Sequence, residues 1–247
     1  MRGEEMSEMF VGYAGVYGDR LFAFESVASP KGFPYLTGRE QHQMILYRPR
    51  FRNPRKAAAP VNLVAAEKRS PNINPVSASI ADLMIDVEAP DRQTFAIDDP
   101  ALITHLRNGI DAQHELTLLR SDKAMTDSQP VSIFAVQTAK QLEQETGVPI
   151  DKRRFRANIY LDLNSSEGFA EDRFVGESLR VGSKAVIAVL RRDSRCMMIT
   201  LDPETAEKRP DIFKQVTQAH EGKAGVYGAV LTEGMVRRGD PVELLDR

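Results

Sequence analysis

The chain contains a single cysteine, Cys196, and its thiol is the side chain best suited to carry chemistry. It ends the segment Arg-Arg-Asp-Ser-Arg-Cys at residues 191–196 and precedes an apolar run at residues 197–201. A thiolate is a soft ligand that suits soft metals and sulfur chemistry, and neighbouring guanidinium groups favour the ionised form of a thiol. Free cysteines also occur as small buried side chains, so the sequence leaves open an inert, packed Cys196.

Arginines that could bind an anion lie in three other segments. The run Arg-Phe-Arg-Ala-Asn at residues 154–158 precedes a predicted strand and offers Arg156 and Asn158. Gly-Asp-Arg at residues 18–20 offers Arg20, and Thr-Gly-Arg-Glu at residues 37–40 offers a further arginine. A guanidinium is a planar fork for phosphate, and an Asn amide can pair with a heterocycle edge. Read one at a time, these segments are equally compatible with solvated loops and surface ion pairs.

Other chemistry is disfavoured by the sequence. The four histidines, at positions 42, 105, 114 and 220, lack the spacing of a zinc site. No glycine-rich phosphate loop of the Walker or dinucleotide type occurs. The acidic turn at residues 202–205 does not form a general acid/base pair, and the basic stretch at residues 48–56 is read as a solvated loop.

Composition restricts the location and the partners. Lys and Arg number 33 and Asp and Glu number 35, a net charge of −2, so we expect no nucleic-acid affinity. No window is apolar enough for a membrane span, and residues 1–10 do not resemble a signal peptide. One cysteine forms no internal disulfide, which favours the cytoplasm.

The elements that must position these residues are mostly short strands. In the first part we predict strands at residues 21–27, 43–47, 83–87 and 115–119, with another possible at 61–65. Helices are predicted at 101–108, capped by Asp99, and at 131–146, ended by Gly147. After residue 154 the predicted strands lie at 159–163, 178–181, 185–190, 197–201, 226–231 and 242–245, with one helix at 211–219. This pattern predicts a mainly β, barrel-like protein rather than a parallel α/β sheet.

Taken in order, these segments resemble the MOSC domain family over almost the whole chain. The resemblance is carried by five segments of the second part, at residues 154–158, 170–173, 194–196, 201–205 and 239–242. Residues 15–20 and 36–40 are similar to the N-terminal β-barrel domain of the mitochondrial amidoxime-reducing components and their bacterial relatives. The resemblance implies an N-terminal β-barrel-like domain over residues 1–100, without its first strand, and a MOSC β-barrel over residues 101–247.

The resemblance also implies a molybdenum cofactor between the two domains. The position of Cys196 implies coordination of molybdenum, and the positions of Arg20, Arg156 and Asn158 imply contacts with the pterin or its phosphate. We further expect Arg195 to line the same cleft. Converging arginines suit an anionic cofactor, and a thiolate suits molybdenum beside the dithiolene sulfurs of the cofactor.

This chain departs from the family pattern at three places. The family opens with a strand ending in a Pro-Val-Lys-Ser-like run that has no match here, so we expect substoichiometric metal. Ala157 replaces a proline and Ala206 replaces a glycine.

Three functions remain open from the sequence. The favoured one is a reductase of small N-hydroxylated or N-oxide compounds, supplied with electrons by an external electron-transfer protein. The second is a sulfur carrier with a persulfide on Cys196. The third is a non-catalytic cofactor-binding module of the same fold.

Overall fold

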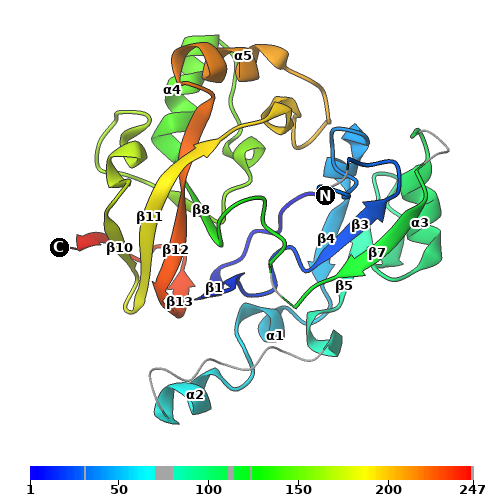
Figure 1. Cartoon of the computed structure of the whole chain (residues 1–247), viewed down its shortest axis with the longest axis horizontal. Helices are drawn as coiled ribbons and strands as arrows, with labels where there is room; N and C mark the ends of the chain where they lie inside the picture. The colour runs from blue at the N-terminus through cyan, green and yellow to red at the C-terminus, as the bar shows by residue number, and fades with distance from the viewer. Residues whose placement is uncertain (31, 70–79, 111–113, 123, 246–247) are drawn as a thin grey trace.

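The structure is a computed structural model that describes residues 1–30, 32–69, 80–110, 114–122 and 124–245. The fold is mainly β, as the sequence predicts, with short helices at its periphery (Figure 1). Two groups of sheets, each with its own apolar core, lie side by side. No helix in the described part of the chain has the length and apolarity that crossing a membrane requires.

The larger group is built on a curled six-stranded sheet in the order β14-β10-β11-β12-β8-β9. Only the β8–β9 pair is parallel. The strands are β8 (Val131–Ala135), β9 (Ile159–Leu161), β10 (Ser178–Val181), β11 (Ala185–Ser194), β12 (Lys223–Thr232) and β14 (Val242–Leu245). Alternate side chains of the long strands β11 and β12, such as Ile187, Val189 and Val226, enter one core because successive residues of a strand face opposite sides.

The start of the chain belongs to this larger core. Strand β1 (Glu8–Gly12) pairs with β13 (Gly234–Arg237) and with the short β2 (Gly15–Val16). Val11 and Val16 are buried against the strands of the six-stranded sheet.

The smaller group contains two sheets. One pairs β3 (Phe22–Ser26) with β7 (Leu116–Arg120), and the other orders β4 (Arg48–Phe51), β5 (Ile85–Glu88) and β6 (Thr94–Ala96). Helix α3 (Pro100–Arg107) packs Leu102 and Leu106 into their common core. Because β1 pairs with β13 and β7 pairs with β3, the chain crosses between the two groups more than once. A domain boundary between residues 100 and 101 stays a prediction.

The remaining helices are short and connect strands. They are α1 (Pro54–Ala58), α2 (Leu63–Arg69), α4 (Val136–Thr146), α5 (Pro210–Ala219) and the 3-10 turns η1 (His42–Leu46), η2 (Ile80–Leu83), η3 (Lys152–Phe155), η4 (Ala170–Phe174) and η5 (Met197–Thr200).

Several local predictions are confirmed and five are wrong. The basic stretch at residues 48–56, predicted as a solvated loop, instead contains strand β4 and the start of helix α1. The side chain of Asp99 accepts a hydrogen bond from the backbone N–H of Ala101 at 2.8 Å, and the left-handed Gly147 ends α4, both as predicted. The helix predicted for residues 131–146 begins only at Val136, because residues 131–135 form the buried strand β8. Residues 43–47 and 197–201 are mostly 3-10 turns rather than strands, and the possible strand at 61–65 runs into α2. Periodicity alone does not separate short apolar strands from short helices.

Candidate functional site

Cys196 lies where the long strand β11 gives way to η5. Its thiol is free, and the residue is partly exposed rather than packed in a core. Three irregularities in the pairing of β11 with β12 precede it, and the last two lie between Val189 and Arg191 and between Arg192 and Ser194. Bulges of this kind bend a strand and redirect the side chains that follow. The local backbone therefore turns Cys196 out of the sheet.

Two buried arginines fasten the residues on either side of Cys196 to the segment at residues 154–158. Arg154 donates from Nη1 to the carbonyl oxygen of Thr200 at 2.9 Å and from Nη2 to Oδ2 of Asp202 at 2.7 Å. In the opposite direction, Arg195 donates from Nη1 to the carbonyl oxygen of Phe155 at 2.8 Å. The segment at residues 154–158 and the segment that carries Cys196 are thus held together by reciprocal hydrogen bonds.

Arg195 is enclosed by protein and donates internally through Nε and Nη1. Nε donates to the carbonyl oxygen of Ala224 at 2.6 Å, and Nη2 lies 2.8 Å from Oδ2 of Asp193, whose side chain is only 2% exposed. The guanidinium also lies over the rings of Phe155 and Phe134. Burial lowers the pKa of Arg195, and the charge of Asp193 opposes that shift. The position adjoins Cys196 as predicted, but its internal bonds favour a supporting role.

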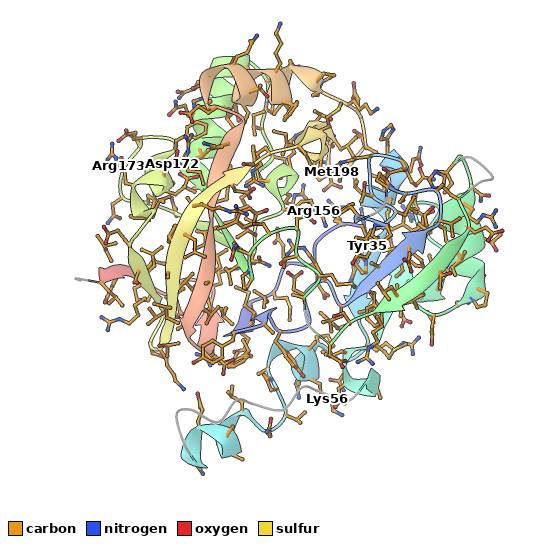
Figure 2. The ribbon with its side chains drawn as sticks, viewed as in Figure 1. Tyr35, Lys56, Arg156, Asp172, Arg173 and Met198 are labelled. Carbon is orange, nitrogen blue, oxygen red and sulfur yellow. The ribbon has the colours of Figure 1, made fainter. Side chains whose placement is uncertain are left out.

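Arg20 and Arg156 meet at the boundary between the two groups of sheets. Nη2 of Arg20 donates to the carbonyl oxygen of Arg156 at 3.2 Å, and Nη1 of Arg156 donates to the carbonyl oxygen of Met1 at 2.8 Å. Both residues have left-handed backbones, with φ of 48° and 53°, a conformation that is uncommon outside glycine and concentrates at functional sites. In Figure 2, Arg156 lies between the two groups of sheets, below Met198.

Arg156 combines solvent contact with dense surroundings. Its side chain is exposed, yet the surrounding protein and then the charge of Arg20 lower the pKa of Arg156. Among the described residues, none supplies Arg156 with a carboxylate at ion-pairing distance; Asp19 and Asp127 act on it only from further away.

Asn158 joins this group through Asp19. Its Oδ1 accepts hydrogen bonds from the backbone N–H and the hydroxyl of Ser132 at 3.0 and 2.9 Å, which ties the start of β8 to the start of β9. Its Nδ2 donates to Oδ2 of Asp19 at 2.9 Å, and Arg20 donates to the same oxygen at 2.6 Å. One amide hydrogen of Asn158 remains for a ligand.

A further arginine, Arg39, reaches Cys196 from the smaller group of sheets. A hydrogen bond with the Cys196 thiol is the main reason that the pKa of Arg39 is raised. Asp127 influences the charges of both Arg39 and Arg156, which places these two arginines in one neighbourhood. The sequence flagged the segment at residues 37–40 as holding a further arginine, but local pattern gave no reason to connect it with Cys196.

The other segments that carried the resemblance are structural. Glu171 is fully buried and accepts hydrogen bonds from the backbone N–H of Ala135 at 3.2 Å and from the hydroxyl of Thr138, so it caps the start of α4. Asp172 pairs with Arg192 at 2.8 Å. The acidic side chains of this turn therefore fasten it to the start of α4 and to β11.

The acidic turn after η5 is also structural. Oδ1 of Asp202 accepts from the backbone N–H groups of Glu204 and Thr205 at 2.9 and 3.1 Å, and Ala206 has a left-handed backbone with φ of 61°. The backbone there explains why glycine suits the position that Ala206 occupies.

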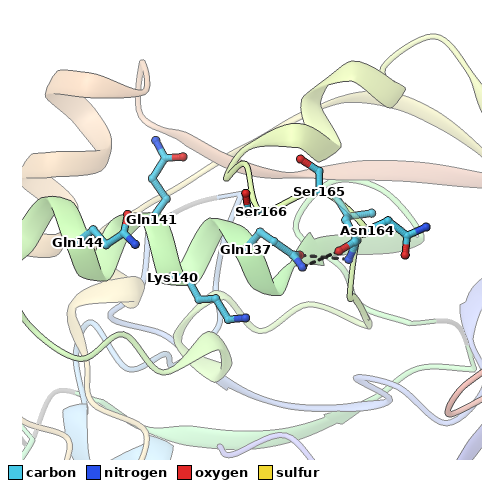
Figure 3. Close-up of a pocket in the computed structure, with 8 residues that line it drawn as sticks. Gln137, Lys140, Gln141, Gln144, Asn164, Ser165 and Ser166 are labelled. Carbon is cyan, nitrogen blue, oxygen red and sulfur yellow. Dashed lines mark hydrogen bonds between the residues drawn. The ribbon is translucent and has the colours of Figure 1, made fainter.

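A cavity of about 420 Å³ lies elsewhere, beside α4 (Figure 3). It is lined by polar side chains that include Gln137, Lys140 and Ser166, and Gln137 hydrogen-bonds the backbone of Leu163. Neither Cys196 nor any of the arginines described above lines it. We therefore place the candidate site at Cys196, where groups from distant segments converge, and not at this cavity.

Comparison with known proteins gives one family match. The MOSC domain model matches residues 120–243. No curated protein matches the chain.

Among solved structures, YiiM from Geobacillus stearothermophilus is 22% identical, with a TM-score of 0.39, over 53% of this chain and 68% of that one. The YUAD protein from Bacillus subtilis is 17% identical, with a TM-score of 0.38, over 52% of this chain and 66% of that one. YiiM from Escherichia coli is 19% identical, with a TM-score of 0.36, over 49% of this chain and 56% of that one.

Proposed function

Because this chain belongs to the MOSC domain family, we propose that it binds a molybdenum cofactor and that Cys196 supplies a thiolate ligand to the molybdenum. The observation that carries the proposal is the placement of the single thiol. Cys196 is partly exposed at a strand end, contacts Arg39, and lies on a segment locked to the Arg156 segment by buried arginines.

The side chains near Cys196 suit such a cofactor, because arginines complement its negative charge and a thiolate is a soft metal ligand. Among the described residues, no group of three or more His, Cys, Asp or Glu side chains could hold a metal ion. A thiolate from Cys196 would therefore act together with the sulfur ligands of the cofactor. Arg39 and Arg156 lack a close carboxylate partner in the described part of the chain, so their charge is available to an anionic pterin phosphate.

The residues divide into two roles under this proposal. Arg20, Arg156 and the free amide hydrogen of Asn158 would hold the cofactor, because each lies at the boundary between the two groups of sheets. Arg154 and Arg195 would position Cys196, since they donate to backbone carbonyls and pair with Asp202 and Asp193. Removing a positioning arginine would displace the thiol without removing a direct contact.

The proposed activity is reduction of small N-hydroxylated or N-oxide compounds. For an N-hydroxylated substrate the N–O bond breaks, two electrons and two protons are taken up, and the products are the N–H compound and water. The bound cofactor would supply the oxygen-atom and redox chemistry, and the protein would orient it. A chain with one cysteine has no internal dithiol whose oxidation could supply two electrons, and the two electrons would come from an external electron-transfer protein.

The test compares wild type with Cys196→Ser, both produced in a host that makes the cofactor. Molybdenum per chain is measured by mass spectrometry, and circular dichroism verifies the fold. We expect wild type to carry molybdenum and Cys196→Ser to lose most of it. Ser194→Ala is the matched control: it removes one polar atom from an exposed neighbour and should keep the metal. Equal molybdenum in wild type and Cys196→Ser would remove Cys196 from the site.

The same preparations separate the two other functions. Treatment with cyanide releases thiocyanate from a persulfide. Wild type without molybdenum but with cyanide-releasable sulfur, absent from Cys196→Ser, would identify a sulfur carrier. Wild type that carries molybdenum but does not reduce N-hydroxylated compounds would identify a non-catalytic cofactor-binding module.

A further inference from the structure

The segment that carries Arg39 is ordered by its own hydrogen bonds. Glu40 accepts from the backbone N–H and the hydroxyl of Thr37 at 2.9 and 2.8 Å, and the Thr37 hydroxyl oxygen accepts from the backbone N–H of Arg39 at 3.1 Å. The carboxylate of Glu40 is therefore engaged with Thr37 rather than with Arg39. The segment thus presents a guanidinium without pairing it internally.

The same segment sits directly on η5, the turn that follows Cys196. A Cβ placed on Gly38 would lie 2.8 Å from Cε of Met198 and 3.0 Å from Cδ1 of Leu201. Both atoms are ends of flexible side chains, so a larger residue at position 38 would require those side chains or the segment itself to shift. The contact places the segment that carries Arg39 against the turn that follows Cys196.

The guanidinium of Arg39 is held between a ring and a thiol. It lies 5.9 Å from the ring centroid of Phe33, which packs edge-on against Tyr35 at 5.2 Å. On its other side it interacts with the thiol of Cys196. The charges of Glu40 and then Asp127 also raise the pKa of Arg39, without an ion pair to either in the described part of the chain.

We propose that Arg39 is a positioning residue of the Cys196 site. It completes the site from the smaller group of sheets, because its positive charge draws an anionic group to the thiol. The proposal rests on the proposed function insofar as Cys196 is the working residue. It adds that neither group of sheets forms the site alone, and that Gly38 is the contact that seats Arg39. The ligand class is an anion, such as a phosphate-bearing or thiolate-bearing group, bound beside Cys196.

The single cysteine allows a direct test in the full chain without any cofactor. Two disulfide reagents are used, the dianionic dithiobis-nitrobenzoate and the neutral dithiodipyridine. In each reaction the thiolate of Cys196 forms a mixed disulfide and releases one coloured leaving group, so the rate reports on this residue only. The measured quantity is the ratio of the rate with the anionic reagent to the rate with the neutral reagent.

We expect Arg39→Gln to lower this ratio about fivefold at low salt, the effect of removing one unit charge roughly 4 Å from another in water. Arg39→Lys should restore most of the ratio, because it restores the charge. The difference between wild type and Arg39→Gln should shrink in high salt, which screens exposed charges. Arg238→Gln, at a site 73% exposed in its side chain, is the matched control and should leave the ratio unchanged.

A purely structural role would change both rates together, so an unchanged ratio in Arg39→Gln would overturn the proposal. Gly38→Val supplies a second measure, because its side chain would crowd Met198 and Leu201 and so disturb the contact between the two segments, while Arg39 itself is left intact. We expect it to lower the ratio while the circular dichroism spectrum is kept; an unchanged ratio would show that this contact does not seat Arg39. Molybdenum content plays no part in these rates, so failure of this proposal is distinguishable from failure of the proposed function.

Discussion

Asp193 is a buried carboxylic acid whose ionisation should control part of the stability of this protein. Its side chain is 2% exposed, and Oδ2 lies 2.8 Å from Nη2 of Arg195. The other charged or titratable groups that act on it are Tyr227, by a hydrogen bond, and Asp127 and Arg20 from further away. Burial outweighs the attraction of Arg195 and raises the pKa of Asp193 from 3.8 to about 6.

The sign of the effect follows from proton binding. Between pH 4 and pH 6 the folded state holds more protons at Asp193 than the unfolded state, so the free energy of unfolding falls as pH rises. The pKa of Asp193 differs by about two units between the unfolded and folded states, and at ~1.4 kcal/mol for each unit this corresponds to about 3 kcal/mol. Asparagine does not ionise, so the free energy of unfolding of Asp193→Asn has no such fall as pH rises. We expect the stability of the variant relative to wild type to rise by up to about 3 kcal/mol between pH 4 and pH 7.

The assay is urea unfolding from pH 4 to pH 8, followed by circular dichroism because the chain has no tryptophan. Comparing variant with wild type at each pH cancels the titration of all other groups. Asp211→Asn removes one partner of an exposed ion pair with Arg209 and is the control; we expect a difference below about 1 kcal/mol. The reasoning fails if Asp193→Asn is about 3–5 kcal/mol less stable than wild type at pH 7 and equal to it at pH 4. That result would mean that the ion pair with Arg195 stabilises more than burial costs.

Two further predictions concern the segments that support the site. Ala206→Gly should raise the free energy of unfolding, measured by urea unfolding, by about 0.5–1 kcal/mol. Glycine relieves the left-handed backbone strain, and this gain exceeds the additional backbone entropy that glycine loses on folding. A lower free energy of unfolding would contradict this. Glu171→Ala should lower it by about 2–3 kcal/mol, since the backbone N–H of Ala135 and the hydroxyl of Thr138 lose a buried acceptor, and hydrogen exchange at the start of α4 should accelerate. Unchanged exchange there would show that Glu171 does not cap the helix.

Local patterns in the sequence were sufficient where the determining contacts are close along the chain. Residues 178–181 and 242–245 were predicted as strands with the bounds that the structure shows, because alternation and flanking turn residues define a strand locally. The cap at Asp99 and the end of α4 at Gly147 depend on neighbours within a few residues. The order of the five segments likewise indicated the MOSC domain family, which the family model matched to residues 120–243 shows.

Tertiary structure decided the features that depend on partners distant in the sequence. The apolar run at residues 131–135 is a strand because it lies between β12 and β9, a placement that its own periodicity does not encode. The sequence does not distinguish Arg154 and Arg195 from Arg156. In the structure Arg154 and Arg195 are buried and donate to distant backbone carbonyls, whereas Arg156 faces solvent.

The sequence alone therefore determined the fold class, the family and the choice of Cys196 as the candidate residue, since these depend on residue type, order and local pattern. Only the tertiary structure decided which arginines remain available beside that thiol, because a guanidinium's partners are set by packing between segments far apart in the chain. Arg39 shows this best: nothing in residues 37–40 points to Cys196, and their contact arises from the close approach of Gly38 to Met198 and Leu201.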